Sequence, residues 1–450
     1  MTVIDRIAEA VGDVQYARLP SSIQQVVRRS LLDTLIVGIA GNDAEGVPAL
    51  RSMARFEGSA PHSSVWGTNE QLSAGWAALV NGVAASALEL DTLNGNVHSD
   101  AVVLPAALAV AERTDASGAD FLAGYVAGVE LVGRMGEVAV EGQKGWSFTS
   151  IYGVFGAAAA AARIANASDT AVRDALGLGL ATAAGSQQPN AERVLAKRLQ
   201  PGLAARNGVF AADAAMAGIS APRQAIEGKA GLNALYHEIQ QERLLKDWGT
   251  RFAIANTAIK KYPVCACSHA AIEACIALRA RHHIDPSLVR RVDVRLTPFS
   301  YGMVGAAFDP RGNPQVMGQY SVQYAIACVL LHGGMTLADL DPAKVRDPTV
   351  TNIVHRVAVH ADPNAKGDLI PATVIITTMD GATFEQTITA LPGSPEAPIS
   401  DEALVLKLAA CARPHSIDLA MAQVGKLDRA ISTLQDRKSM TGFLAEALYA

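Results

Sequence analysis

The chain has 450 residues, a length that usually folds as several domains or as one large domain with a smaller one attached. Half of the residues are hydrophobic and only 5% are aromatic, a composition that favours closely packed helices over an aromatic-rich β-sandwich. The net charge of -5 and the isoelectric point near 6.1 argue against a general nucleic-acid-binding protein, which normally carries a basic surface.

The cysteine content and the N-terminal segment indicate the cellular compartment in which the protein is expected. Five cysteines without a spaced disulfide framework indicate a reducing environment. The N-terminus lacks the basic and then apolar layout of a signal peptide, and no apolar stretch is long enough to cross a bilayer. We therefore expect a cytoplasmic protein that binds neither membranes nor nucleic acid.

Residues 1 to about 265 are predicted to form one helix after another, because apolar residues recur at helical spacing. Small side chains dominate these segments, so the helices can approach closely and bury more than one face. The predicted helices cover residues 21–41, 74–90, 103–113, 118–139, 153–164 and 170–184.

After residue 285 the hydrophobic pattern changes to an alternation of period two, which is typical of strands. The predicted strands cover residues 289–299, 356–363 and 372–388, the last as a hairpin that turns at Asp380-Gly381, with a helix at 321–334. Residues 391–400 form a Pro/Ser-rich linker, and the tail is helical again.

These patterns predict a mainly α chain with an α+β portion. We expect a large all-helical domain formed by residues 1–265 and 400–450. A smaller α+β domain with an antiparallel sheet is expected to take residues 266–399.

Asp91 and His98 lie in a Gly/Asn-rich segment between two apolar helices. A loop held by two rigid helices can present an acid and a base. The alternative interpretation is a helix cap at Asp91 and a surface histidine at position 98.

Ser147 and Thr149 precede a helix of very small residues, whose first backbone amides favour a carboxylate. Lys197 precedes a Pro-Gly break and could bind or polarise a carboxylate. Ordinary helix capping and a surface lysine are the alternatives for these positions.

Lys260 and His269 flank a Tyr-Pro break that leads into a helix. Cys265, Cys267 and His269 alternate, which suggests a metal site. Structural zinc, however, usually needs four ligands with C-x2-C-type spacing, and no second cluster is found. We interpret the two cysteines as small core residues and expect no metal.

Tyr320 and Tyr324 are four residues apart, a spacing that places them on one face of a helix. Helical tyrosines are more often edges of a core than catalysts. The motifs of serine hydrolases, zinc proteases and dinucleotide-binding enzymes are missing from the sequence.

Taken in order, five segments between about residue 80 and residue 335 resemble the MmgE/PrpD family, which includes 2-methylcitrate dehydratase, cis-aconitate decarboxylase and iminodisuccinate epimerase. The five segments read ALELDTLNGNVHSDAVVLPAALA, GVFGAAAAAARI, KRLQPGLAARNGVFAADAAMAG continuing to EGKAGL, IKKYPVCACSH and YSVQYAIACVLLHG. The order of the segments is far more specific than any one of them.

The resemblance implies a helical domain with a smaller α+β lid, a homodimer, a site in the cleft between the domains, and no metal or organic cofactor. By matching motif it implies the catalytic residues Asp91, His98, Lys197, His269 and Tyr324. Ser147, Thr149 and Lys260 would bind the substrate, a small polycarboxylate.

Two landmarks differ from the family pattern. The family's G-x-H-x-T segment reads GWSFT, so that Ser147 replaces a histidine, and the aspartate region reads LDTLNGN rather than a double-Asp form. A serine cannot exchange a proton near neutral pH without help.

The family reactions pass near a carbanion beside a carboxylate, which cations and hydrogen-bond donors must stabilise. Lysines suit that task, and histidine is the residue type that titrates near neutral pH. The hypothesis is a lyase that works as a hydro-lyase on a hydroxy-polycarboxylate. An epimerase of an amino- or imino-polycarboxylate, a decarboxylase of a cis-aconitate-like acid and a catalytically dead binding protein are the alternatives.

Overall fold

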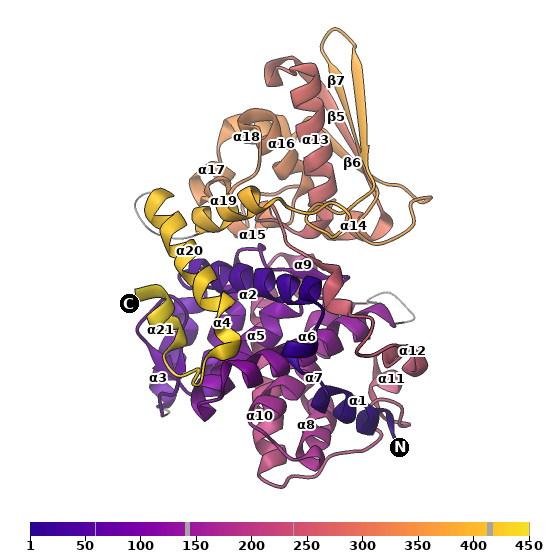
Figure 1. Ribbon diagram of the computed structural model, residues 1–450. Coiled ribbons are helices and arrows are strands. Elements are labelled where there is room, and N and C mark those ends of the chain that lie inside the picture. The colour runs from indigo at the N-terminus through magenta and orange to yellow at the C-terminus, as the bar shows by residue number, and fades with distance from the viewer. Residues whose placement is uncertain (59, 140–144, 237, 412–416, 450) are drawn as a thin grey trace.

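The computed structural model describes residues 1–58, 60–139, 145–236, 238–411 and 417–449. Figure 1 shows two parts, a helical part with most of the N-terminal helices and a sheet part formed by the later segments. The prediction of a mainly α fold with an α+β portion is confirmed. None of the described helices is both long and apolar enough to cross a membrane.

Among the described residues, the helical part is built from α1 to α12 and from α19 to α21. Its helices are α1 (Val3–Gly12), α2 (Ser21–Gly41), α3 (Val47–Glu57), α4 (Ala74–Ala87), α5 (Asp100–Thr114), α6 (Gly118–Glu137), α7 (Phe148–Ile164), α8 (Asp169–Thr182), α9 (Gln188–Glu192), α10 (Ala196–Met216), α11 (Leu232–Leu235), α12 (Gln241–Leu244), α19 (Asp401–Cys411), α20 (Ile417–Ser432) and α21 (Phe443–Tyr449). Two short two-stranded sheets accompany them, β1 (Ser63–Ser64) with β2 (Gln71–Leu72) and β3 (Leu93–Asn94) with β4 (Thr257–Ala258).

Helix α7 forms the centre of the helical part and is buried along nearly its whole length, among α5, α6, α8 and α10. Small residues allow this packing. A Cβ on Gly156 would lie 2.6 Å from the carbonyl oxygen of Gly128 in α6, and a Cβ on Gly128 would lie 2.5 Å from that of Gly156. Only glycine at both positions lets the two helix backbones approach this closely.

Glu112 in α5 carries a buried carboxyl group that accepts hydrogen bonds from the backbone and hydroxyl of Ser64, at 2.6 and 2.8 Å. Burial raises the pKa of this carboxyl to about 7. A raised pKa stabilises the folded state at low pH, and that contribution is lost as the pH rises from about 4 to about 7. We expect Glu112→Gln to remove this pH dependence and to stabilise the protein at pH 8 by up to roughly 3 kcal/mol. Thermal unfolding of both proteins at pH 5 and pH 8 measures the effect, and an equal difference at the two pH values would contradict it.

The sheet part contains six helices and a four-stranded sheet in the order β6-β5-β7-β8. Its elements are α13 (His269–His282), β5 (Val289–Leu296), α14 (Pro298–Val304), α15 (Pro314–Gln319), α16 (Val322–His332), α17 (Pro342–Val345), α18 (Pro348–Val354), β6 (Val357–Ala361), β7 (Ala372–Thr378) and β8 (Thr383–Ile388). Helix α13 packs on β7 and β8, and α16 packs on α13 and β6.

The hairpin predicted at Asp380-Gly381 is confirmed, because β7 and β8 pair antiparallel around this turn. The predicted antiparallel sheet is mixed, since β5, β7 and β8 pair antiparallel while β6 pairs with β5 in parallel. The connection between these two strands contains α14 to α18, and a crossover of this length can return the chain in the same direction.

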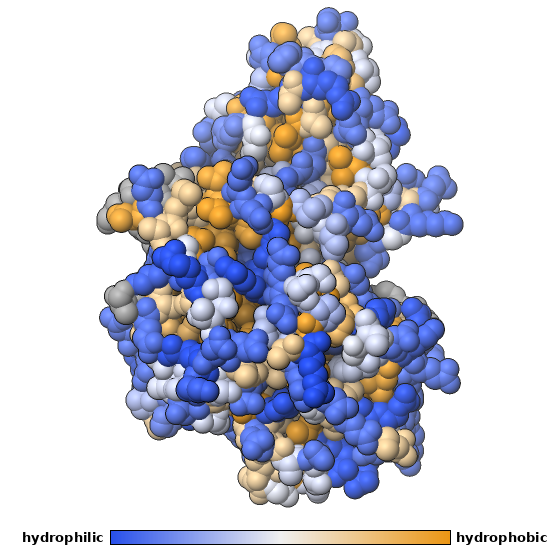
Figure 2. All heavy atoms as spheres, in the orientation of Figure 1, coloured by the Kyte–Doolittle hydropathy of each residue, from blue (hydrophilic) through white to orange (hydrophobic). Residues whose placement is uncertain are grey.

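Two separate clusters of buried hydrophobic residues underlie the two parts. One cluster takes residues from 3 to 259 and from 399 to 447, and the other takes residues from 262 to 376. The C-terminal helices α19 and α20 pack on α2 of the helical part, as Figure 1 shows. This arrangement supports domain boundaries near residues 265 and 400, which remain our proposal. The face seen in Figure 2 is mostly hydrophilic, with apolar patches near the waist between the two parts.

Candidate active site

The loop between α4 and α5 carries the first acidic residues of the site. Helix α4 ends at Ala87, and Glu89 adopts a left-handed backbone conformation with φ 53°, so the chain turns sharply there. Strand β3 then pairs with β4, with Leu93 opposite Ala258. This pairing brings Lys260, two residues beyond Ala258, next to Asp91.

A pocket of about 780 Å³, partly open to solvent, lies where this loop meets α9, α10 and the sheet part. It is lined by Glu89, Asp91, Leu93, Asn96, His98, Ser147, Thr149, Gln187, Asn190, Lys197, Gln200, Pro201, Cys265, Ala266, Cys267, Phe299, Met303, Tyr320, Asp368 and Leu369. Both parts of the molecule therefore contribute to its wall.

His98 is held by three contacts in this pocket. Its Nδ1 lies 2.9 Å from Asp91 Oδ2 and 3.0 Å from the carbonyl oxygen of Thr92, and its backbone N–H donates to Thr149 Oγ1 at 3.0 Å. A carbonyl oxygen can only accept, so Nδ1 carries the hydrogen. The other ring nitrogen, Nε2, is left to exchange a proton with a ligand.

Glu89 is the centre of a network of charged groups. Its carboxylate accepts hydrogen bonds from Lys197 Nζ, from Lys260 Nζ at 3.0 Å and from the Tyr320 hydroxyl at 2.6 Å. Lys260 Nζ also lies 3.3 Å from Asp91 Oδ1. Two ammonium groups thus face two carboxylates, and the formal charges of these four groups cancel.

The buried ion pairs set the charge states of this network. Burial alone would raise the pKa of the Glu89 carboxyl, but the ammonium groups of Lys197 and Lys260 hold it well below its ordinary value. Burial likewise opposes ionisation of Asp91, yet the neighbouring His98 and Lys260 lower its pKa to about 2. Burial also disfavours the charged form of Lys260, but the two carboxylates raise its pKa. Both carboxylates and Lys260 are therefore charged at neutral pH.

The structure brings together most of the residues predicted from the sequence. Five of them line the pocket, and Lys260 lies directly behind it in contact with both carboxylates; the five are Asp91, His98, Ser147, Thr149 and Lys197. Ser147 Oγ lies 3.2 Å from Ser150 Oγ at the start of α7. The roles of these residues remain predictions.

His269 does not line the pocket. It is buried at the start of α13, where its Nε2 lies 3.2 Å from the carbonyl oxygen of Val264. Burial and the nearby Lys260 lower the pKa of His269 to about 3, so its imidazole is neutral at pH 7. This geometry supports a positioning role rather than contact with a substrate.

Tyr324 also lies outside the pocket. Its hydroxyl donates to the carbonyl oxygen of Asp339, and its ring stacks on Phe308. The expectation that Tyr320 and Tyr324 share one helix face is wrong, because α15 ends at Gln319 and α16 begins at Val322. The break between the helices lets Tyr320 reach Glu89 while Tyr324 packs inside the sheet part.

Glu89 and Tyr320 are two of the pocket residues that were not predicted as site residues from the sequence. Glu89 fell inside the predicted helix 74–90, whose true end is Ala87. The sequence does contain an indication of Glu89. Lysines that are largely removed from solvent, such as Lys197 and Lys260, need carboxylate partners, and Glu89 lies two residues before Asp91.

Lys407 of α19 holds the loop from behind. Its Nζ donates to the carbonyl oxygen of Leu90 at 3.0 Å and to Asp33 Oδ1 at 2.6 Å, and all of these groups are buried. We expect Lys407→Met to cost about 3 kcal/mol of unfolding free energy, because it leaves the Asp33 carboxyl buried without its partner. Urea unfolding measures this loss.

A double variant separates stability from positioning. Lys407→Met with Asp33→Asn removes both charges and should recover most of the stability. The carbonyl of Leu90 still lacks its donor, so activity should stay several-fold below that of the wild type. Full activity in the double variant would show that Lys407 does not position the loop.

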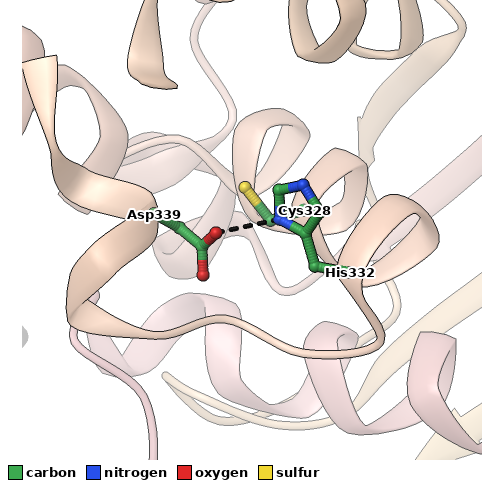
Figure 3. A group of neighbouring side chains, drawn as sticks. All are labelled: Cys328, His332 and Asp339. Atoms are coloured by element: carbon green, nitrogen blue, oxygen red, sulfur yellow. Dashed lines mark hydrogen bonds and ion pairs between the residues drawn. The ribbon is translucent and has the colours of Figure 1, made fainter. Parts of the chain in front are cut away.

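Metal-ligating side chains converge at a different place. Among the described residues, the ligand atoms of Cys328, His332 and Asp339 lie within 4.8 Å of one another in the sheet part. Figure 3 shows the His332 ring facing Asp339, with Nδ1 2.8 Å from Oδ1. The other oxygen of Asp339 accepts from the backbone and hydroxyl of Thr336. These three side chains do not line the pocket and have no part in the site described above.

Comparison with known proteins adds two findings. Residues 5–244 match the MmgE/PrpD N-terminal domain, and residues 262–424 match the MmgE/PrpD C-terminal domain. The chain is 27% identical to cis-aconitate decarboxylase of Homo sapiens, over 97% of this chain and 92% of the human protein. It is 27% identical to the enzyme of the same name from Mus musculus, over 90% and 85%, and 25% identical to that of Aspergillus terreus strain NIH 2624 / FGSC A1156, over 83% and 81%.

Proposed function

Because this chain belongs to the MmgE/PrpD family, we propose that it is a cofactor-independent lyase that forms a carbanion beside a carboxylate of a small polycarboxylate. The reaction that we propose first is decarboxylation of a cis-aconitate-like acid. The observation that carries the proposal is one pocket in which His98, held by Asp91, lies with Lys197 close to the buried Lys260. The names of the curated relatives support the same choice.

The proposed reaction needs a cation and one proton donor. Lys197, at the pocket wall, would hold a substrate carboxylate. The bond to a second carboxylate would break, CO2 would leave, and the electron pair would spread over the neighbouring double bond and carboxylate. His98, protonated at both ring nitrogens, would then deliver a proton from Nε2 to carbon.

The charge balance of the pocket favours this reaction. The charges of the two carboxylates and the two ammonium groups cancel, and the protonated His98 adds one positive charge, so an incoming polycarboxylate competes with Glu89 for Lys197. Loss of CO2 followed by protonation removes one negative charge from the substrate, whereas dehydration leaves the charge of the substrate unchanged. His98 is the single histidine among the described residues that line the pocket, and the proposed decarboxylation needs only one proton transfer to carbon.

Dehydration of a hydroxy-polycarboxylate is the second candidate. The hydroxyls of Ser147 and Thr149 both line the pocket, and Thr149 Oγ1 already contacts His98. These groups could hydrogen-bond a substrate hydroxyl. His98 would take the proton from the carbon beside the carboxylate at Nε2, the C–O bond would break, and His98 would return that proton to the departing hydroxyl, which leaves as water.

A proton NMR time course in D2O tests the proposal. The purified protein is mixed in turn with cis-aconitate, citrate, 2-methylcitrate, malate, tartrate and iminodisuccinate, and CO2 release is followed in parallel. Release of CO2 with new olefinic signals supports decarboxylation, and olefinic signals without CO2 support dehydration. Deuterium exchange without either would replace the lyase by an epimerase. No change with any of the acids would contradict the proposal.

The homodimer implied by the resemblance and the cytoplasmic location expected from the cysteines and the N-terminal segment belong to the same proposal. Analytical ultracentrifugation at micromolar concentration checks the dimer, and a sedimenting monomer would contradict it.

A further inference from the structure

Cys265 and Cys267 lie side by side in the wall of the pocket, on a short turn that enters α13. The backbone N–H of Ser268 donates to the carbonyl oxygen of Cys265 at 2.9 Å, which closes the turn. The backbone N–H of Cys265 donates to the carbonyl oxygen of Gln319 at 2.9 Å, which anchors the turn to the end of α15. The turn is therefore held in place in the wall of the pocket, where Cys265 is 8% and Cys267 2% exposed.

The two thiols interact with each other and with the charged network. The neighbouring Cys267 thiol lowers the pKa of the Cys265 thiol, and the ammonium group of Lys260 acts in the same direction, against burial and Glu89. The pKa of the Cys267 thiol is raised well above its ordinary value by Cys265 and by burial. Burial also raises the pKa of Cys275 and of Cys411 to about 12. Neither of these cysteines lines the pocket.

We propose that Cys265 and Cys267 form an oxidisable dithiol in the pocket wall, which hydrogen peroxide or an organic hydroperoxide converts into a disulfide. The proposal does not depend on which reaction the enzyme catalyses, because it rests only on the pair of thiols and on their access from the pocket. The proposed lyase mechanism does not use these thiols. Their oxidation would make the covalent state of the pocket wall depend on the peroxide concentration.

The chemistry balances in two steps. The Cys265 thiolate attacks one peroxide oxygen, the O–O bond breaks, and a sulfenic acid forms while the other oxygen leaves as water after taking up a proton. The Cys267 sulfur then attacks the Cys265 sulfur, the S–O bond breaks, and a second water leaves as the S–S bond forms. The two sulfur atoms are oxidised, and hydrogen peroxide is reduced to two molecules of water, or an organic hydroperoxide to one alcohol and one water.

The geometry permits the second step. Residues two apart in a turn have Cα atoms about 5–6 Å apart, which is within the range that a disulfide spans.

Peptide mass spectrometry tests the proposal without an activity assay. The native protein is treated with hydrogen peroxide, denatured, alkylated with N-ethylmaleimide and digested with trypsin. The peptide of residues 262–279 contains Cys265, Cys267 and Cys275, so it should carry one alkyl group and lack two hydrogen atoms. Prior reduction with dithiothreitol should restore three alkyl groups.

Two variants identify the cysteines involved. Cys275→Ala is the matched control and should still form the disulfide. Cys267→Ser should form none and should leave a sulfenic acid on Cys265 that dimedone traps. Three alkyl groups on the wild-type peptide after peroxide, or a disulfide that includes Cys275, would overturn the proposal whether or not the variants fold.

Discussion

Lys197→Met is expected to lower kcat/KM by roughly 10³-fold, because it removes the ammonium group that the pocket offers to a substrate carboxylate. Lys197 lines the pocket, and its Nζ is bound by Glu89 and lies 5.8 Å from the centre of the Tyr320 ring. Methionine has a similar length and fills the same space without a charge. Steady-state kinetics on the substrate found by NMR measures the loss.

The partners of Glu89 make this substitution tolerable for the fold. Without Lys197 the Glu89 carboxylate still has Lys260 and Tyr320, so we expect only a modest change in melting temperature. Lys261→Met is the matched control, since Lys261 pairs with Glu273 and does not line the pocket. Equal activity losses in the two variants would mean that the pocket is not the site of the reaction.

The helical part was predictable because its signals are local. The segments 118–139 and 170–184 correspond to α6 and α8, where Ser117 and Ser168 cap the first turn as such residues commonly do. Helical periodicity alone could not show where α4 ends. The turn at Glu89 depends on contacts with Lys197 and Lys260, which lie 108 and 171 residues away in the chain.

The residue types that form the site could be predicted from the sequence, and so could some of the positions that they occupy. The family motifs named Asp91, His98 and Lys197, which the fold does bring to one pocket. The same motifs also named His269 and Tyr324, whose burial depends on packing that no single segment encodes. A one-sequence pattern cannot tell a histidine that lines a pocket from one that is hydrogen-bonded beneath it.

His98→Gln is expected to lower kcat/KM by about 10²–10⁴-fold, the range typical for loss of a general acid or base. Glutamine is close in size and can keep a hydrogen bond to the carbonyl oxygen of Thr92 or to Asp91, but it cannot exchange a proton near neutral pH. The pocket position of His98 and its 2.9 Å contact with the ionised Asp91 carry the expectation.

His269→Gln is the informative comparison, because both histidines were predicted as catalytic. Its imidazole is neutral and buried, so its replacement should lower the melting temperature while kcat/KM falls by less than about tenfold. Kinetics and thermal unfolding of both variants separate the two roles. If His269→Gln lost activity as severely as His98→Gln with an unchanged melting temperature, the proton donor would have to be His269. The pocket would then have to open toward α13 during the reaction.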